Sequence, residues 1–562
     1  MDGRGVRVAR LIFARGSETY QHPQSTRRLV RALSHLTTSP VKQSAQTKAG
    51  LGGLSALVQT AGIRSLMVYL AFVGMAVGGL LLRLHHLAAK GLSDEAASWT
   101  FARLGWTRFW EVMWEYEGNM VFYYLLLRGW IRLGDSELIL RSLSVIFGIA
   151  AVIALYRFGS RLFSNLTGLI AAALLAVHAL HIEYSQDARS YSLLMFLVIL
   201  SCQFFVNAVE QPTRKRYWAA YVAVSSLAFY SHILAVLVFA AQWLSVRLAR
   251  LRRIGLPTTV VVSATLIAIL FPGIVFVATN NRGQLQWVEP LSWDLASWVI
   301  RTFTGDGGVY LSALYIATAL AAIDPADWRI RFTIGWLIGP IVALLAISVF
   351  TPVLTTRFML MCLPALALLS ARGMVRLGAI SGFSRCVSCS IFALLLFLSL
   401  RGDTRYFGYA QASGVSFNPM TRYILDRAAP DDGIFFFTAA THMSFKYYAE
   451  RRQQENGAAE NTTPAILFPS FGDMPTGAQP TPTRSEVQAA VRGHRRVWLV
   501  LNNSSIALVE GRESAARMIR STLEDTFRVA KKKLFSKSPK LTVVLYVRRD
   551  GMIDPTNQAR RR

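Results

Sequence analysis

Eleven long apolar stretches dominate this sequence and restrict the chain to folds that place many helices in a lipid bilayer. A helix needs about 20 apolar residues to cross the hydrocarbon core, so we expect flanking aromatic or amphipathic residues to complete the shorter stretches. Only 16% of the residues are charged, against about 25% in soluble domains. We therefore predict an all-α polytopic membrane bundle of about eleven spans, at 66–82, 142–156, 166–180, 191–209, 217–231, 233–246, 257–278, 309–323, 332–350, 358–371 and 387–400.

The distribution of Lys and Arg predicts the orientation of the chain. If residues 1–60 form a cytoplasmic leader, the segments on that side hold more than twice as many basic residues as the outer loops. The leader is basic and poor in acids, so we expect it to be disordered, and it does not resemble a secretory signal. An odd number of spans then places the C-terminal region outside the cytoplasm, in a multi-pass protein of the plasma (inner) membrane.

The composition changes after residue 400 to that of a soluble domain. The stretch "DDGIFFFTAATHMSFKYYAERR" predicts a turn, a strand and a helix, and "HRRVWLVLNN" and "KLTVVLYVRR" predict buried strands. We expect a transmembrane domain at 61–400 and a small extracytoplasmic α/β domain at 401–562. Residues 453–485, rich in Gln, Asn, Thr, Pro and Gly, are predicted to form a flexible loop.

Small residues within the apolar stretches are interpreted as packing elements. Gly74 and Gly78 have the spacing of a helix contact, which we expect inside one chain. The four cysteines fall in or beside apolar stretches and suggest no disulfide framework; they are Cys202, Cys362, Cys386 and Cys389. The pair in "CVSC" has metal-binding spacing without a second pair, which favours apolar packing.

The net charge of +28 does not indicate a nucleic-acid partner. The basic residues are spread over short loops beside the apolar stretches, where they set topology and contact anionic lipids. The sequence also contains no phosphate-binding loop of the Walker type and no G-x-G-x-x-G motif after a strand. A nucleotide is therefore not expected to be the direct substrate.

Two adjacent acids, Asp94 and Glu95, follow the first apolar stretch in "GLSDEAASW". After Ser93 they fit the first turn of a helix, where carboxylates are favourable without any chemistry. Their surroundings point further, because a tryptophan recurs every fourth residue at 106, 110 and 114 and would line one face of a helix in the membrane interface. We interpret the next segment, "MVFYYLLLRGWIRLG", as a re-entrant or interfacial helix.

Other ionisable residues fall on the same predicted outer face as Asp94. Asp187 and Arg189 occur in "HIEYSQDARSY", His232 ends the fifth stretch and Arg357 begins the tenth. Each residue alone has a plain explanation, such as a helix cap, a local ion pair or a side chain that reaches the interface. Ionisable groups near the membrane are costly and usually line a site, so their convergence predicts one.

The order of these motifs resembles a known enzyme family. "SDEAASW", the aromatic helix, "FYYLLLRGWIRLGDSELILRSLSVIFG", "LHIEYSQDARSYSLL", "YSH" and the later "RF" and "LP" are similar to the GT-C membrane glycosyltransferases of the protein O-mannosyltransferase superfamily. Within it, the chain resembles the bacterial RgtA/B/C/D-like branch, which is related to the lipid A aminoarabinose transferase. The resemblance covers residues 60 to about 375. Where a typical member has "HPPLYY", this chain has "GNMVFYY", which lacks the pair of prolines.

The resemblance implies an inverting transfer, on the outer face, of a hexose or pentose from a polyprenyl-phosphate donor. Asp94 would be the general base and Glu95 its partner. A partly buried carboxylate can take the proton of an acceptor hydroxyl. Arg189 and Arg357 would bind the donor phosphate, with Asp187, Tyr191 and His232 as further substrate-binding residues.

A divalent cation is a candidate cofactor, because it would prefer oxygen ligands of the kind that Asp94, Glu95 and Asp187 offer. Enzymes of the GT-C type differ in their use of a metal, so the resemblance leaves both options open. Membrane lipids surround the chain in either case, and the acceptor is a lipid, a glycan or a protein.

Two other functions fit many of the same features. A transporter or lipid flippase also has many spans and buried charges, although no repeat between the halves of the chain supports it. A cell-envelope scaffold would use the outer domain as a binding module. Release of polyprenyl phosphate from a lipid-linked sugar would separate the enzyme from both alternatives.

Overall fold

The computed structural model describes most of the chain beyond the leader. The described residues are 66–88, 91–248, 255–280, 288–412, 417–437, 439–456, 463–468, 481–507, 511–535 and 540–549. The predicted leader at 1–60 and much of the predicted loop at 453–485 lie outside them.

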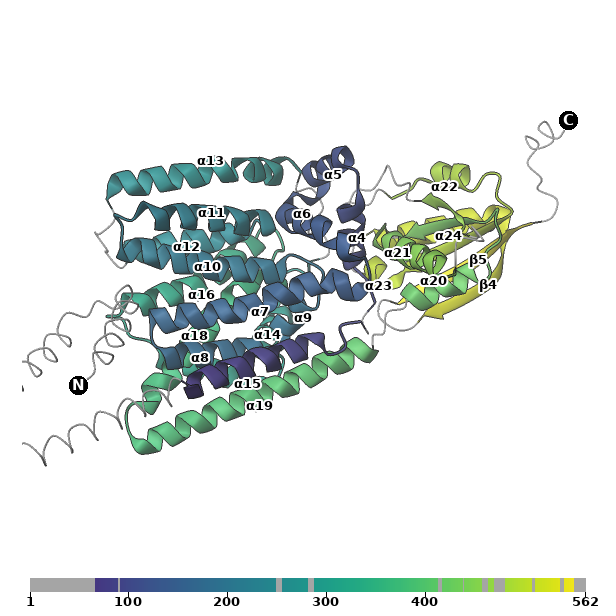
Figure 1. Ribbon diagram of the computed structural model, residues 1–562. Coiled ribbons are helices and arrows are strands. Elements are labelled where there is room, and N and C mark those ends of the chain that lie inside the picture. Colours follow the sequence, from purple (N-terminus) through teal and green to yellow (C-terminus); the bar gives the residue numbers. More distant parts are fainter. Residues whose placement is uncertain are drawn as a thin grey trace, which may run out of the picture. The chain divides into compact units, whose positions relative to one another are not determined.

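Seven described helices are long and apolar enough to cross a membrane, or eight if one bent pair counts as a single span. They are Leu66–Leu84, α7 (Glu137–Leu162), α10 (Tyr191–Glu210), α13 (Leu256–Asn280), α16 (Trp328–Ser348), the segment Thr356–Gly378 that ends in α18 (Leu363–Gly378), and α19 (Gly382–Ala412). The bent pair is α8 (Asn165–Ala176) with α9 (Ala179–Ser185), at an angle of 64°. The predicted polytopic helical bundle is therefore confirmed (Figure 1).

The remaining predicted spans are also helical but shorter than a bilayer core. They are α11 (Lys215–Ser231), α12 (Ala235–Leu248) and α15 (Val309–Ala321), with 17, 14 and 13 residues. At a rise of about 1.5 Å per residue they extend roughly 20 to 25 Å, against about 30 Å for the hydrocarbon core. They pack against the longer helices α10, α16 and α18, respectively.

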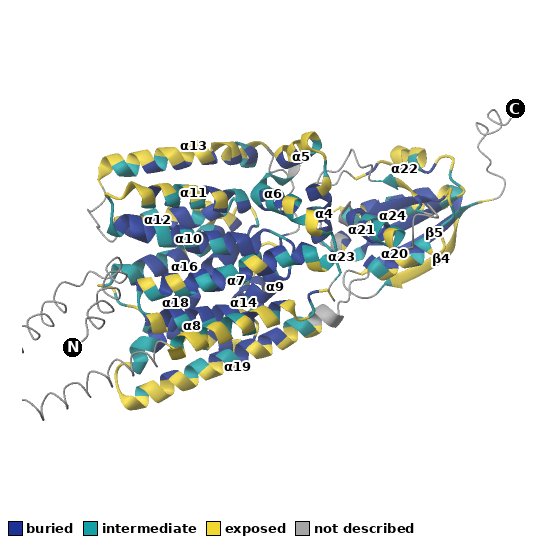
Figure 2. Ribbon diagram, viewed as in Figure 1, coloured by how far each residue is buried: buried dark blue, intermediate teal, exposed yellow. Residues whose placement is uncertain are grey.

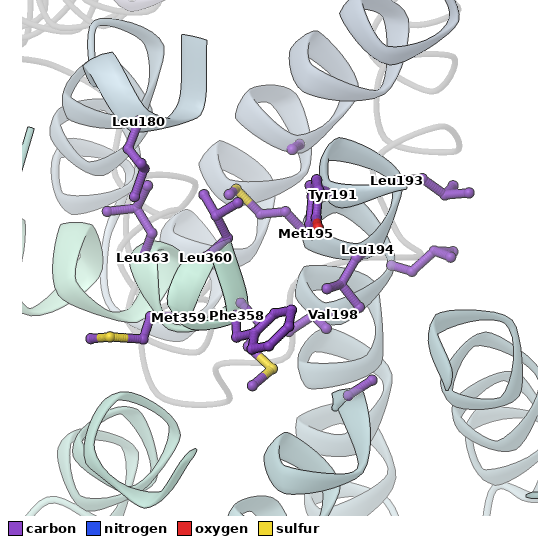
Figure 3. Close-up of a cluster of buried hydrophobic side chains, with 14 of the residues drawn as sticks. Leu180, Tyr191, Leu193, Leu194, Met195, Val198, Phe358, Met359, Leu360 and Leu363 are labelled. Atoms are coloured by element: carbon purple, nitrogen blue, oxygen red, sulfur yellow. The ribbon is translucent and has the colours of Figure 1, made fainter. Parts of the chain in front are cut away.

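The centre of the bundle is formed by α7, α8, α10 and α18, whereas α13 and α19 expose much of their surface (Figures 1 and 2). Figure 3 shows part of this core, where Val198 of α10 lies beside Phe358 and Leu363 lies beside Leu180. The helices α7 and α8 approach closely because Gly168 has no side chain: a Cβ there would lie 2.5 Å from the carbonyl oxygen of Tyr156.

The expected helix contact at Gly74 and Gly78 is wrong. A Cβ built on either glycine meets no described atom within 4 Å, whereas one on Gly79 would lie 3.3 Å from the Cβ of Ala176. The close contact thus belongs to the neighbouring position, on another face of the helix. Spacing alone could not distinguish the two, because it does not show which face meets a partner.

Short helices fill the segment between the first helix and α7. They are α4 (Glu95–Arg103), α5 (Trp106–Val112), the π-helical turn η1 (Met113–Glu117), the 3₁₀ turn η2 (Gly118–Met120), α6 (Val121–Trp130) and the 3₁₀ turn η3 (Ile131–Leu133). Trp106, Trp110 and Trp114 are all about half exposed, as expected for one outward face. The ten residues of α6 are too few to span a bilayer, which agrees with the interpretation of a re-entrant or interfacial helix.

The C-terminal region contains a five-stranded mixed sheet in the order β2-β1-β3-β5-β4. The strands are β1 (Gly433–Phe437), β2 (Ala465–Phe468), β3 (Arg496–Asn502), β4 (Phe527–Phe535) and β5 (Leu541–Arg548). β1 is parallel to β2 and β3, and β5 is antiparallel to β3 and β4. The expected small α/β domain is confirmed, and its three predicted strands are β1, β3 and β5.

Helices pack on this sheet, chiefly α20 (Phe417–Leu425), α21 (Ala439–Asn456), α22 (Arg484–Ala490), α23 (Asn503–Ala507) and α24 (Arg512–Thr526). The edge strand β4 was not predicted. Most of its residues are exposed, and three are consecutive lysines, a composition that protects a free edge from pairing but hides the strand from hydropathy patterns.

Candidate active site

Asp94 precedes the first turn of α4 but does not cap it. Its backbone is in the helical region, its side chain makes no capping hydrogen bond, and the residue is exposed. The expectation of partial burial is therefore wrong. The capping explanation also loses its basis, because a capping carboxylate would accept a hydrogen bond from a backbone N–H in that turn.

Glu95 has a different environment, although it is the next residue. It is 1% exposed and accepts hydrogen bonds from Nε and Nη2 of Arg141, at 2.8 and 2.5 Å, and from the backbone N–H of Ala188 at 2.8 Å. Arg141 also donates to the carbonyl oxygens of Leu87 and Gly91. The Glu95 carboxylate thus joins α4 to α7 and to the loop that contains Asp187 and Arg189.

Arg189 is connected to the first outer segment through a tyrosine. Its Nη1 donates to the Tyr124 hydroxyl at 3.1 Å, and that hydroxyl donates to Oε2 of Glu117 at 3.4 Å. Burial lowers the pKa of Arg189, but Tyr124, Glu117 and other acidic groups outweigh it and raise that pKa well above its ordinary value. Arg189 is therefore a fixed cation, and one of the acidic groups that stabilise it is Asp94.

Glu117 was missed by the sequence analysis. It is half-buried at the end of η1. Burial raises the pKa of the Glu117 carboxyl, Arg189 and the Tyr124 hydroxyl lower it, and Asp94 raises it further. The only signal in the sequence was an acid beside glycine in "EYEGNM", the segment that differs from the expected family motif.

The other expected substrate-binding residues gather on the facing helices. The His232 ring packs on Tyr191 and on Phe358, with centroid separations of 5.9 and 5.2 Å. Asn119 accepts a hydrogen bond from the backbone N–H after His232 and lies 3.5 Å from the His232 ring nitrogen. Arg357, in α17 (Thr356–Met359), lies beside Tyr191 and within electrostatic reach of Asp94.

Asp187 lies in the same loop as Arg189 but acts on different groups. Its backbone carbonyl accepts a hydrogen bond from the Arg189 N–H at 2.7 Å, which tightens the turn. Its charge acts on Arg141 and on Tyr184. The structure thus brings Asp94, Arg189 and Arg357 into one electrostatic cluster and places Asp187 near the Glu95–Arg141 pair.

The candidate metal ligands do not form a cluster among the described residues. In the part of the chain that the structure describes, no three His, Cys, Asp or Glu side chains are placed to hold a metal ion. Both oxygens of the Glu95 carboxylate are engaged by Arg141, one of them also by Ala188. The set of Asp94, Glu95 and Asp187 therefore does not fit a shared cation.

The C-terminal domain contacts the helix that follows Asp94. From α21, the Tyr448 hydroxyl accepts a hydrogen bond from the Leu92 N–H at 2.8 Å and donates to Glu137 at 2.6 Å. Trp99 packs edge-on against Tyr447 with centroids 5.2 Å apart. The segment around Asp94 is thus held to the helical bundle by Glu95 and to the C-terminal domain by α21.

Comparison with known proteins agrees with the class expected from the sequence. A sequence profile of the family described as dolichyl-phosphate-mannose-protein mannosyltransferase matches residues 120–276. This segment includes Tyr124, Arg189 and His232. A sequence comparison with curated proteins gives no match.

Solved structures resemble the whole architecture. ArnT from Cupriavidus metallidurans in the apo state aligns with a TM-score of 0.55 at 11% identity, over 85% of this chain and 97% of that chain. This chain has a fold like that of ArnT. The ArnT structure bound to undecaprenyl phosphate gives a TM-score of 0.53 at 12% identity, over 87% and 99% of the two chains. The archaeal oligosaccharyltransferase AglB from Archaeoglobus fulgidus, in complex with an inhibitory peptide and a dolichol-phosphate, gives 0.51 at 11% identity, over 86% and 75%.

Proposed function

We propose that this protein is a membrane glycosyltransferase that moves a sugar from a polyprenyl-phosphate donor to an acceptor hydroxyl with inversion at the anomeric carbon. The observation that carries the proposal is the cluster of one uncapped, exposed carboxylate, Asp94, with two cations, Arg189 and Arg357. The ArnT-like fold and the partial family match support the same class. The ArnT structure with undecaprenyl phosphate and the AglB structure with dolichol-phosphate support the donor class.

Asp94 acts as the general base in this proposal. The acceptor oxygen forms a bond to the anomeric carbon while the bond from that carbon to the phosphate oxygen breaks. The proton of the acceptor hydroxyl passes to Asp94, and polyprenyl phosphate leaves. A positioned carboxylate typically contributes about 10²- to 10⁴-fold to such a step. Asp94 is available for it because no hydrogen bond commits its side chain to the start of α4.

Arg189 and Arg357 hold the phosphate in the proposal. The leaving phosphate gains negative charge as the bond breaks, and fixed cations stabilise that charge best when they need no reorganisation. The hydrogen bond to Tyr124 fixes Arg189, and the packing around Tyr191 and His232 fixes the wall beside Arg357. Glu95 and Asp187 position α4 and the loop beside these groups in the proposal.

The acceptor and the branch of the family extend the proposal further. The motif order supports an RgtA/B/C/D-like enzyme that transfers a hexose or pentose to a lipid, glycan or protein of the envelope. The charge bias supports a cytoplasmic leader at 1–60, a transmembrane domain at 61–400 and an extracytoplasmic domain at 401–562. The helix α19 continues from Gly382 to Ala412, across the proposed boundary at residue 400.

The test is a transfer assay with the purified full-length protein. A panel of undecaprenyl-phosphate-linked hexoses and pentoses is incubated with envelope lipids and peptides, and released undecaprenyl phosphate is measured. Release that requires an acceptor supports the proposal. A flippase would move the intact donor across vesicles without release, and a scaffold would do neither, so either result would reject the enzyme.

A further inference from the structure

An apolar groove of about 710 Å³ lies between the first helix, α8 and α19, and its lining includes none of the residues of the candidate active site. Its walls are mostly aliphatic and include Leu82 and Leu400, with the open surface of Gly78 on the first helix. One end is polar, where His85, Asp403 and Thr404 lie beside Phe407. The groove is therefore amphipathic along its length.

Asp403 is the unusual feature of the polar end. The residue is 2% exposed, and neither carboxylate oxygen has a hydrogen-bond partner among the described residues. A buried carboxylate without donors is costly, and such groups in proteins normally find partners. The Asp403 carboxylate thus lacks hydrogen-bond donors among the described residues. A molecule bound in the groove could supply them.

Arg83 does not supply those donors. Its buried guanidinium donates to the carbonyl oxygens of Gly79 and Ala176 and to the Ser185 hydroxyl, and it contacts the His181 ring nitrogen. Burial has the largest effect on the Asp403 carboxyl, and the charge of Arg83, which acts from a distance, does not outweigh it. The requirement at Asp403 is consequently for N–H or O–H groups in contact with it.

The position of the groove matches the profile of a bilayer. Asp403 comes 21 residues after the start of α19, which corresponds to roughly 30 Å along the helix, the thickness of the hydrocarbon core. His85 likewise follows the end of the first helix at Leu84. The polar end is thus at the level of lipid head groups, and the aliphatic walls extend beside the hydrocarbon chains.

We propose that this groove binds a membrane glycerophospholipid with an ethanolamine head group, whose acyl chain lies along the apolar walls and whose ammonium donates to Asp403. An ammonium has three donors and forms charge-assisted hydrogen bonds with a carboxylate. A choline head group has a similar size and charge but no N–H, so it cannot satisfy Asp403. The site is separate from the donor site of the proposed reaction and does not depend on it.

The test uses full-length protein in nanodiscs that contain equal amounts of phosphatidylethanolamine and phosphatidylcholine with identical acyl chains. Lipids retained after release into detergent are counted by native mass spectrometry. We expect retention of the ethanolamine lipid to exceed that of the choline lipid by about tenfold, the lower range for a hydrogen bond to a charged group. In Asp403→Asn this preference should fall to about threefold or less, whereas Asp294→Asn, an exposed acid on another helix, should keep it.

A pair of glycine variants provides the second measurement. A Cβ built on Gly78, which lines the groove, meets no described atom within 4 Å, so Gly78→Leu should extend its side chain into the groove. Gly74, one turn earlier, is equally open but lies outside the groove lining, so Gly74→Leu is the matched control. We expect Gly78→Leu to reduce lipid retention at least about tenfold and Gly74→Leu to leave it unchanged. Equal retention of both lipids by the wild type would overturn the proposal, as would equal lipid retention by the two leucine variants.

Discussion

Replacement of Glu95 by Gln should lower the stability of the protein more than replacement of its neighbour Asp94 by Asn. The side chains of Glu95 and Arg141 are about 2% and 1% exposed and are joined by two hydrogen bonds, so the variant leaves a buried guanidinium without its counter-charge. Loss of one partner of a buried pair costs about 3–5 kcal/mol. The amide oxygen of Gln can still accept one hydrogen bond, so we expect the lower value, about 3 kcal/mol. For a chain of 562 residues, that corresponds to an apparent unfolding midpoint lowered by about 2–3 °C.

The assay is thermal unfolding of the purified protein in detergent, with wild type, Glu95→Gln, Asp94→Asn and the double variant Glu95→Gln/Arg141→Met. The double variant removes both charges and should recover part of the lost stability, because it no longer buries an unpaired cation. Asp94→Asn should unfold near the wild-type midpoint. If Glu95→Gln unfolds with the wild type, or if the double variant is no more stable than Glu95→Gln, the pair does not hold the site together.

Three further changes test the surroundings of the site. Burial lowers the pKa of His442 in the C-terminal domain to about 4, so the fold should lose stability as the pH falls from the ordinary value of 6.5 toward 4. When unfolding is measured against pH, the stability that His442→Asn loses over this range should be smaller than the wild-type loss by up to about 3 kcal/mol. Burial raises the pKa of Glu117, so its contribution to stability is present at low pH and is lost as the pH rises through that raised pKa; Glu117→Gln should remove this dependence in the same measurement. Tyr448→Phe leaves the Leu92 N–H without its acceptor and Glu137 without a donor, and its unfolding midpoint should correspond to a loss of about 1–3 kcal/mol.

The bundle was predictable because apolar composition and length alone define a helix in a bilayer. The C-terminal strands β1, β3 and β5 were predictable for a related reason, since each is a short, nearly continuous apolar run. Short helices such as α12 and α15 were predicted as apolar stretches, but each was interpreted as a complete membrane span. Their apolar composition marks burial, and burial within a protein bundle has the same sequence signal as burial in lipid.

The candidate site was only partly predictable. Charge bias and motif order selected Asp94, Arg189 and Arg357, which the structure brings within electrostatic reach of one another. The difference between Asp94 and Glu95 could not be predicted, because it depends on Arg141, which lies 46 residues away from Glu95 in the sequence. Glu117 was missed because its environment depends on burial at a π-helical turn, and no local pattern indicates that turn.

The measurement that tests the central claim most directly is transfer by Asp94→Asn. Asn is nearly as good as Asp at the start of a helix, and the Asp94 side chain makes no capping hydrogen bond, so folding should be unchanged. The amide cannot accept the acceptor's proton, and the rate of undecaprenyl phosphate release from the lipid-linked sugar panel should fall by at least about 100-fold at an unchanged unfolding midpoint. Release at a rate near that of the wild type would show that Asp94 is not the base and would remove the central residue from the proposed mechanism.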